Sequence, residues 1–271
     1  MLAPLRMKVC AMLPSLFLSH GSPMTAITDT PGRRFLTGLA ARLPRPRAIL
    51  VATAHWAEER PTLSAGPHPD TIHDFGGFPP ALYALRYAAP GAPALAARAA
   101  ALLDAAGLGA ALDPERGFDH GTWVPLLLAW PEADIPVVQL ASQPWLGPAH
   151  QMALGRALRP LAEEGVLVIG SGSFTHNLGR IRRDAIGAPE PPDIVAFADW
   201  MHAALTEGRT EDLLAYRRLA PYAAMQHPTD EHLLPLYVAL GAAAEGAKAE
   251  RLHASADYGV LRMDAYAFTK S

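Results

Sequence analysis

The chain has 271 residues, of which 50% are hydrophobic and 18% are charged, and its formal net charge is −3. This balance argues against nucleic acid as the main partner, because phosphate binding needs a clustered basic surface, and no apolar run approaches the roughly 18 residues that cross a bilayer. A single cysteine, Cys10, excludes an internal disulfide and a cysteine-based zinc site. We therefore expect a globular cytoplasmic protein with no membrane partner.

The first residues differ in character from the rest. Their apolar stretch is broken by Pro14 and leads into "SHGSP" without a small-residue cleavage site, so a signal peptide is not expected. We interpret residues 1–14 as an extension, either disordered or an artefact of the start site, with Met1, Met7 and Met12 as candidate initiators. Residues 15–271 are expected to form one domain.

The chain alternates between short apolar segments and Ala/Leu-rich segments. The apolar segments lack polar alternation, which predicts strands covered on both faces, and the Ala/Leu-rich segments end in glycine, which is typical of helices. This order predicts a single-domain α/β fold with a central, mostly parallel or mixed β-sheet and helices on both faces. The expected strands are 15–18, 48–53, 135–140, 166–169 and 258–268, and the expected helices are 92–107, 148–165 and 192–208.

Histidines follow three of these strands. His20 comes after the first strand, His55 after the second, and His176 after the fourth and a Gly/Ser turn. In open α/β sheets, ligands bind beyond the carboxyl ends of the strands. One such histidine alone would ordinarily be structural, but three independent occurrences indicate a site at this edge of the sheet.

Two further motifs carry histidines. "GFDHGTWVPL" places His120 between an acid and a glycine, close to Trp123. "HPTDEHLLPL" carries His227 and His232, whose spacing of five excludes an HExxH zinc helix. His232 is expected at a helix start, either in a first turn capped by Thr229 or in the loop before a helix that begins with proline.

The remaining histidines divide into two groups. His73, in "IHDFGGFP", is expected in a shaped loop over an apolar pocket, because two glycines and two phenylalanines surround it. No motif surrounds the others, which we interpret as structural or surface residues: His68, His150, His202 and His253.

The chemistry of such a cluster follows from its ligand type. Three histidines without cysteine suit zinc and ferrous iron equally, and a fourth histidine could act as a general base because its ordinary pKa is near neutrality. A hydrolytic zinc site would also need a carboxylate to activate water, and Asp74, Asp119 or Glu231 could provide one. The residues alone predict a histidine-rich mononuclear metal enzyme on an α/β sheet, with the metal left open.

Seven motifs together resemble a known family. They are "SHGSP", "AHW", "HDFGGFP", "DHGTWVPL", "SGSFTHN", "HPTDEHLLPL" and "YGVLRMDAY". In this order they are similar to the DOPA-dioxygenase branch of the class III extradiol ring-cleavage dioxygenases, relatives of the protocatechuate 4,5-dioxygenase β subunit. The resemblance runs from about Leu16 to Tyr266. It implies that 15–271 is a catalytic domain that opens a small aromatic catechol, DOPA-like or caffeate-like, with O2.

The resemblance also implies roles for the histidines. His20, His55 and His232 would hold Fe(II), with Zn(II) as an alternative in isolated protein. His176 would be the acid/base histidine and a possible fourth ligand in the resting state, and His120 a second catalytic histidine. A triad of neutral ligands would leave the iron more positive than a triad with a carboxylate. The implied substrate-binding residues are His227, His73 and Trp123.

One position departs from the family pattern, and two other functions stay open. Gly76 stands where the motif often has tyrosine ("HDFYGFP"), which predicts a larger cavity and a bulkier catechol. The alternatives are a zinc-dependent hydrolase that uses the same histidines and a non-enzymatic binding protein on the same fold.

Overall fold

The computed structural model of the protein describes residues 12–181 and 189–270. Most of the expected N-terminal extension, including Cys10, lies outside the described residues, as does the start of the proline-rich stretch at 187–193. Within the described ranges, no helix is long and apolar enough to cross a membrane.

A mixed sheet of eight strands forms the centre of the molecule, in the order β4-β3-β5-β2-β6-β1-β10-β7. Its middle is parallel, because β5, β2, β6 and β1 run in the same direction. On one side β10 and then β7 continue antiparallel, and on the other β3 pairs antiparallel with β5 and parallel with β4. The strands are β1 Ser15–Ser19, β2 Ala48–Ala57, β3 Thr62–Ser64, β4 Ala111–Asp113, β5 Val137–Ser142, β6 Val166–Gly172, β7 Lys248–His253 and β10 Ala265–Thr269, with a separate hairpin of β8 Ala256–Asp257 and β9 Leu261–Arg262.

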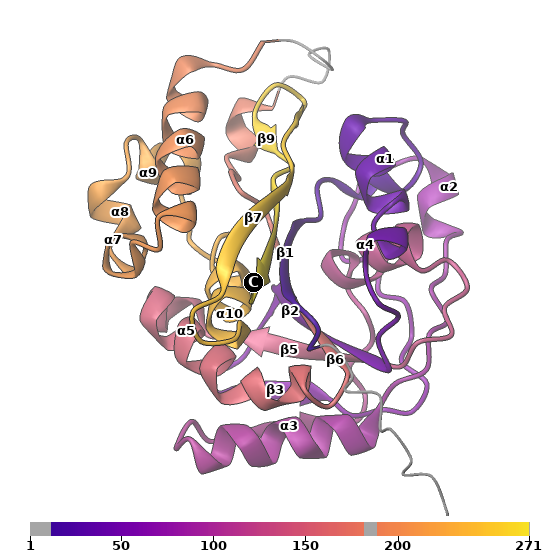
Figure 1. Ribbon diagram of the computed structural model, residues 1–271. Coiled ribbons are helices and arrows are strands. Elements are labelled where there is room, and N and C mark those ends of the chain that lie inside the picture. The colour runs from indigo at the N-terminus through magenta and orange to yellow at the C-terminus, as the bar shows by residue number, and fades with distance from the viewer. Residues whose placement is uncertain (1–11, 182–188, 271) are drawn as a thin grey trace, which may run out of the picture.

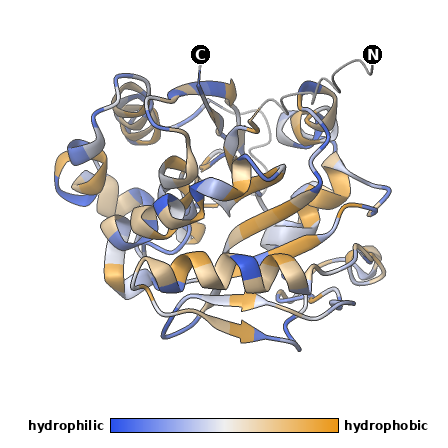
Figure 2. Cartoon of the chain, turned by 60° about the horizontal axis from the view of Figure 1, so that its bottom comes forward, coloured by the Kyte–Doolittle hydropathy of each residue, from blue (hydrophilic) through white to orange (hydrophobic). Residues whose placement is uncertain are grey.

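Helices cover both faces of the sheet (Figure 1). Successive strand residues point to opposite faces, so Leu16 and Leu18 pack with α1 and α4, whereas Phe17 packs with α6 and α10. The central strands are largely apolar (Figure 2), as burial on both faces requires. The helices are α1 Pro31–Thr37, α2 Pro80–Tyr83, α3 Pro93–Ala105, α4 His120–Ala129, α5 Gly147–Leu158, α6 Pro192–Thr206, α7 Thr210–Leu214, α8 Tyr216–Leu219, α9 Ala223–Gln226 and α10 Pro235–Ala242.

The fold confirms the predicted α/β class, while several boundaries differ. The helix expected over 148–165 ends earlier, at Leu158, because Pro160 lacks an N–H and turns the chain into a 3-10 helix. The tail forms two strands instead of one: the Asp264 carbonyl between them accepts from the Ser19 hydroxyl, at 2.8 Å, where the chain passes from the hairpin to the main sheet. Strand β2 extends to Ala57, so His55 lies within the strand and not after it.

Candidate metal centre

His20 and His55 lie at the carboxyl ends of β1 and β2, the two strands that flank β6. His20 directly follows β1, is 2% exposed, and its backbone N–H donates to the Gly172 carbonyl at the end of β6, at 2.9 Å. His55 is carried by the last residues of β2, which pairs with β6 on the other side. Both backbones are therefore fixed by the sheet, and both side chains lie at its carboxyl edge.

His232 comes from far along the chain and docks onto the same edge. Helix α10 begins at Pro235, so His232 lies in the turn before it, which is the second of the two positions expected from the sequence. The Ser173 N–H donates to the His232 carbonyl at 2.8 Å, and a Cβ on Gly172 would collide with that carbonyl. Glycine at 172 is thus what allows this turn to approach the strand so closely.

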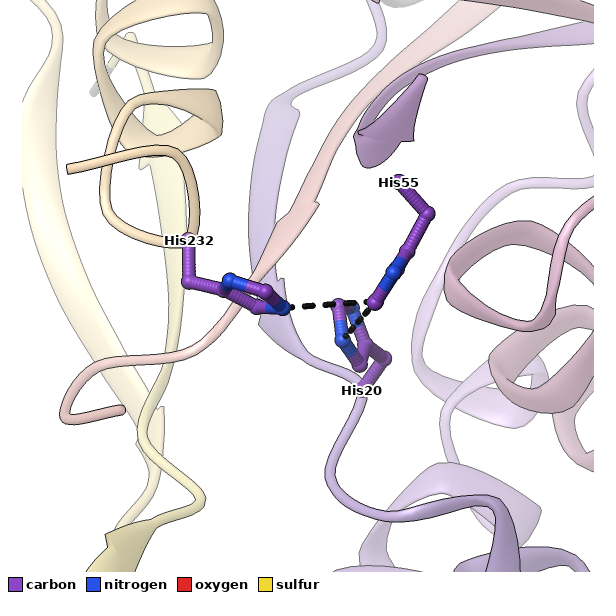
Figure 3. Close-up of side chains that lie close together, drawn as sticks. All are labelled: His20, His55 and His232. Carbon is purple, nitrogen blue, oxygen red and sulfur yellow. Dashed lines mark hydrogen bonds between the residues drawn. The ribbon is translucent and has the colours of Figure 1, made fainter. Parts of the chain in front are cut away.

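The three imidazoles point toward one another (Figure 3). The His55 Nε2 lies 3.1 Å from the His20 Nε2 and 3.3 Å from the His232 Nε2. One nitrogen from each ring falls within 4.8 Å of the others, which is the spacing of ligands around a single ion. The structure therefore brings together the three histidines that the resemblance implied as ligands.

The other nitrogen of each ring faces an oxygen atom. His55 Nδ1 is 3.4 Å from Asp74, and His232 Nδ1 is 3.0 Å from Glu231. His20 Nδ1 is 3.0 Å from the Ser171 hydroxyl, which donates its own hydrogen to the Gly121 carbonyl and so accepts from the ring. In His20 and His232 the Nδ1 therefore carries the proton and the Nε2 presents a lone pair, and the Asp74 carboxylate favours the same tautomer of His55.

This arrangement fits a bound cation. Burial and the neighbouring histidines lower the pKa of His20 and His232 well below 6.5 and that of His55 to about 3, so the rings are neutral near pH 7. Three lone pairs that face one another without a donor repel, and a divalent metal that accepts all three removes this repulsion. By ligand type the set suits iron or zinc.

Two other groups of side chains could in principle hold a metal, and both overlap the first. They are His55–Asp74–His120 and His176–Glu231–His232. In each, the carboxylate already accepts from a ring Nδ1, so the oxygen is engaged as a hydrogen-bond acceptor. Only the central group has three free lone pairs, and it is the better candidate.

His120 is held beside the triad by the start of α4. Asp119 is the N-cap of this helix: it is fully buried and accepts from the Thr122 N–H, from Thr53 and from Gln139, which leaves it no role at the centre. His120 donates to Asp74 twice, from Nδ1 and from the backbone N–H, each at 2.9 Å. Although burial alone would raise the pKa of Asp74, these bonds hold it below its ordinary value, so Asp74 is ionised.

His176 lies on the opposite side of the triad. Its ring stacks on that of His232, with the centroids 3.3 Å apart and the planes 11° apart. Its backbone N–H donates to the Gln226 carbonyl, but within residues 12–181 and 189–270 its imidazole makes no hydrogen bond. Burial lowers the pKa of His176 to about 4, so it is a free base at neutral pH.

The expected substrate-binding residues lie in two places. His73 and Trp123 belong to an aromatic group next to His120: the Phe75 ring is 5.7 Å from both His73 and His120 and 6.2 Å from Trp123, centroid to centroid. Trp123 itself is fully buried. His227 does not join the cluster; it is fully buried and its Nε2 donates to the Phe174 carbonyl at 3.0 Å.

The glycine that departs from the family motif stands in open space. A Cβ on Gly76 would meet no atom within 4 Å, so the position has room for a side chain that this chain lacks. The oxygens of Asp74, Glu231 and Ser171 behind the triad were not predicted as hydrogen-bond partners of its ligands. A pairing such as Asp74 with His120, 46 residues apart, leaves no local pattern in the sequence.

Comparison with known proteins agrees with this geometry. The family model described as "catalytic LigB subunit of aromatic ring-opening dioxygenase" matches residues 14–269. The chain is 45% identical to 4,5-DOPA dioxygenase extradiol of Beta vulgaris, over 95% of this chain and 97% of that protein. It is 42% identical to the Escherichia coli K12 protein of the same name, over 85% of each. A crystal structure of an uncharacterized protein from Escherichia coli K12 has a TM-score of 0.79 and 33% identity, and covers 94% of this chain and 99% of that chain.

Proposed function

This chain belongs to the LigB family of aromatic ring-opening dioxygenases and is an extradiol enzyme, and we propose that it uses Fe(II) and O2 to open a single-ring catechol of the DOPA or caffeate type. The observation that carries the proposal is the convergence of three imidazole Nε2 atoms, each from a ring whose Nδ1 faces an oxygen. Its expected setting is the cytoplasm.

The proposed ligands are His20, His55 and His232. Bound there, Fe(II) would supply a centre at which the two hydroxyls of a catechol and dioxygen can meet, since three protein ligands leave positions open. All other steps belong to side chains of this chain.

We assign the transfer of the catechol proton to His176. It is a free base at neutral pH, and its ring stacks directly on the ligand His232, so a substrate at the metal would lie within its reach. After the aromatic C–C bond breaks and both oxygen atoms enter the product, the same imidazolium can return the proton.

His120 is proposed to have a role other than proton transfer. Asp74 fixes its Nδ1 as a donor, so its Nε2 is an acceptor in a ring held 3.9 Å, centroid to centroid, from His55. We propose that His120 contacts the substrate, with His73 and Trp123 forming the aromatic wall behind it. A role for His227 in substrate binding stays a prediction, and such a role would require the surrounding residues to move.

The zinc hydrolase receives less support from the same geometry. A hydrolase needs a carboxylate free to take a proton from bound water, whereas Asp74 and Glu231 are engaged by ring Nδ1 atoms and Asp119 is fully buried. No observation favours a binding protein that lacks catalysis.

Oxygen consumption tests the proposal. Protein freed of metal would be loaded under anaerobic conditions with Fe(II) or with Zn(II), mixed with DOPA, caffeate or unsubstituted catechol, and exposed to air. We expect oxygen uptake and a yellow ring-opened product with Fe(II) only, and mass spectrometry of the product would distinguish 4,5 from 2,3 cleavage. Turnover with Zn(II) that consumes no oxygen would overturn the proposal.

A further inference from the structure

Two carboxylates lie behind the proposed triad, one on each side. Asp74 approaches the Nδ1 of His55 at 3.4 Å, and Glu231 approaches the Nδ1 of His232 at 3.0 Å. The third ligand, His20, has the neutral Ser171 hydroxyl in the equivalent position. The ligand set is thus neutral, but two of its three members rest against negative charge.

The Asp74 carboxylate contacts two histidine rings, those of His120 and His55. Its Oδ2 accepts from the His120 Nδ1 at 2.9 Å and also faces His55, while its Oδ1 accepts the His120 backbone N–H at 2.9 Å. One carboxylate therefore ties a proposed metal ligand to a proposed substrate contact. Losing it would release both rings together.

The loop that carries Asp74 is anchored independently of the histidines. The Trp123 Nε1 donates to the Ile72 carbonyl at 2.9 Å, and the Ile72 N–H donates to the Phe118 carbonyl at 2.7 Å. On the other side of Asp74, the Phe75 ring packs 5.3 Å from the Tyr83 ring, centroid to centroid. The carboxylate is therefore held in place by its own loop.

Glu231 is positioned in a similar way in the turn before α10. Its Oε1 accepts from the Thr229 hydroxyl at 2.9 Å while it faces His232. A nitrogen of His176 lies within 4.8 Å of the same carboxylate, without a hydrogen bond between them. Glu231 thus fixes one ring, whereas Asp74 fixes two.

We propose that Asp74 and Glu231 are positioning residues that fix His55 and His232 as Nδ1–H tautomers, neutralise the charge of a divalent metal from behind the triad, and, for Asp74, orient His120. The inference rests on the proposed metal site. Two carboxylates balance the two positive charges of the ion, so a triad without a direct carboxylate ligand still sits in a compensated environment. Partners of this kind raise the basicity of a ligating histidine and fix its orientation.

Metal affinity measures the first part of this proposal. In Asp74→Asn and Glu231→Gln we expect the dissociation constant for Zn(II), measured by competition with a chelator, to rise about 10- to 100-fold. Asp193→Asn is the matched control: the Asp193 side chain is 19% exposed against 21% for that of Asp74, but its carboxylate binds Arg180 and Gln226 and no histidine. The control should bind zinc as the unaltered protein does.

Nitrogen NMR of the histidine rings measures tautomers without any variant. In the metal-free protein we expect His55, His232 and His120 to be Nδ1–H tautomers, and Nε2–H resonances for these rings would overturn the proposal. In Asp74→Asn the signals of His55 and His120 should change, whereas in Glu231→Gln only that of His232 should. With saturating Fe(II), Asp74→Asn should raise the KM for the catechol more than Glu231→Gln does, because only Asp74 orients His120.

A fourth variant separates this inference from the proposed function. If His20→Ala abolishes zinc binding while Asp74→Asn and Glu231→Gln behave like Asp193→Asn, the positioning role is wrong and the metal site stands. If His20→Ala also leaves zinc binding unchanged, both proposals fail.

Discussion

The two sides of the candidate metal centre are built from different kinds of structure. On one side, a strand end, the start of α4 and an anchored loop hold His55 and His120, and both rings meet one carboxylate, Asp74. On the other side, turns carry His176 and His232, and the His176 ring is stacked but, among the described residues, not hydrogen-bonded. On one side a carboxylate accepts hydrogen bonds that hold the side chains, and on the other a neutral imidazole base has no hydrogen-bond partner among the described residues and can exchange a proton.

The largest effect should come from removing a ligand on either side. His20→Ala, from the sheet, and His232→Ala, from the turn, should each weaken metal binding by more than the roughly 100-fold expected for an outer hydrogen-bond partner. The loss should be similar for both, because the two rings contribute equivalent lone pairs. Metal content after anaerobic loading measures this loss of binding. A His232→Ala protein that keeps its metal would show that His232 is not a ligand.

The next effect separates the base His176 from His120, which Asp74 holds in place. His176→Gln should lower kcat by about 10²- to 10⁴-fold, the usual contribution of general acid–base catalysis, and leave the metal content unchanged. His120→Gln should instead affect mainly KM, because we assign that ring a substrate contact. Steady-state kinetics at saturating Fe(II) checks the contrast. Equal losses of kcat in both variants would show that His176 and His120 do not have the separate roles of proton transfer and substrate contact.

The stability of the protein at acid pH should depend on the buried His227. Burial lowers the pKa of His227 from 6.5 to about 4 in the folded protein. As the pH falls, His227 is protonated in the unfolded chain before it is protonated in the folded protein. The folded protein therefore keeps its full free energy of unfolding above pH 6.5 and loses the part that depends on His227 as the pH falls toward 4. In metal-free His227→Gln, the difference in unfolding free energy between pH 7 and pH 5 should be about 2 kcal/mol smaller than in the unaltered protein. Urea titrations at the two pH values measure it, and an unchanged difference would contradict the assignment of a buried neutral ring.

The smallest effect concerns the loop on the fixed side. Gly76→Tyr should fold with little loss of stability, because a Cβ there meets nothing within 4 Å, and should raise KM for bulky catechols while sparing small ones. Gly77→Ala is the contrasting change: its φ of +75° costs a residue with a Cβ about 1–2 kcal/mol. Thermal unfolding and KM across a series of catechols check both. A uniform change in KM for all substrates would show that position 76 does not affect substrate size.

The sequence predicted the α/β class and the strands of the parallel core because these strands are continuously apolar and short. It did not predict β7, whose residues are largely polar at a sheet edge, or α4, which contains Pro125 and lacks an Ala/Leu pattern. Of the site, His20 and His55 could be placed at one sheet edge because strand ends follow from local pattern.

The partners behind the ligands depend on distant contacts that local pattern does not encode. Asp74 meets His120 from 46 residues away, and Gly172 meets the His232 carbonyl from 60 away; neither pairing has a period or spacing to detect. These contacts also change the charge expected from the ligands alone. Three neutral histidines alone would leave a bound cation uncompensated, but the carboxylates of Asp74 and Glu231 lie on the Nδ1 side of two of these rings.

The coordination of the metal itself tests the proposed centre most directly. A crystal structure of the anaerobic Fe(II) protein with a bound catechol would show it. We expect iron on the Nε2 atoms of His20, His55 and His232, Asp74 and Glu231 on the Nδ1 side, and His176 within hydrogen-bonding distance of a catechol oxygen. Iron bound directly to Asp74 or Glu231, or bound away from His20, would contradict the proposed coordination.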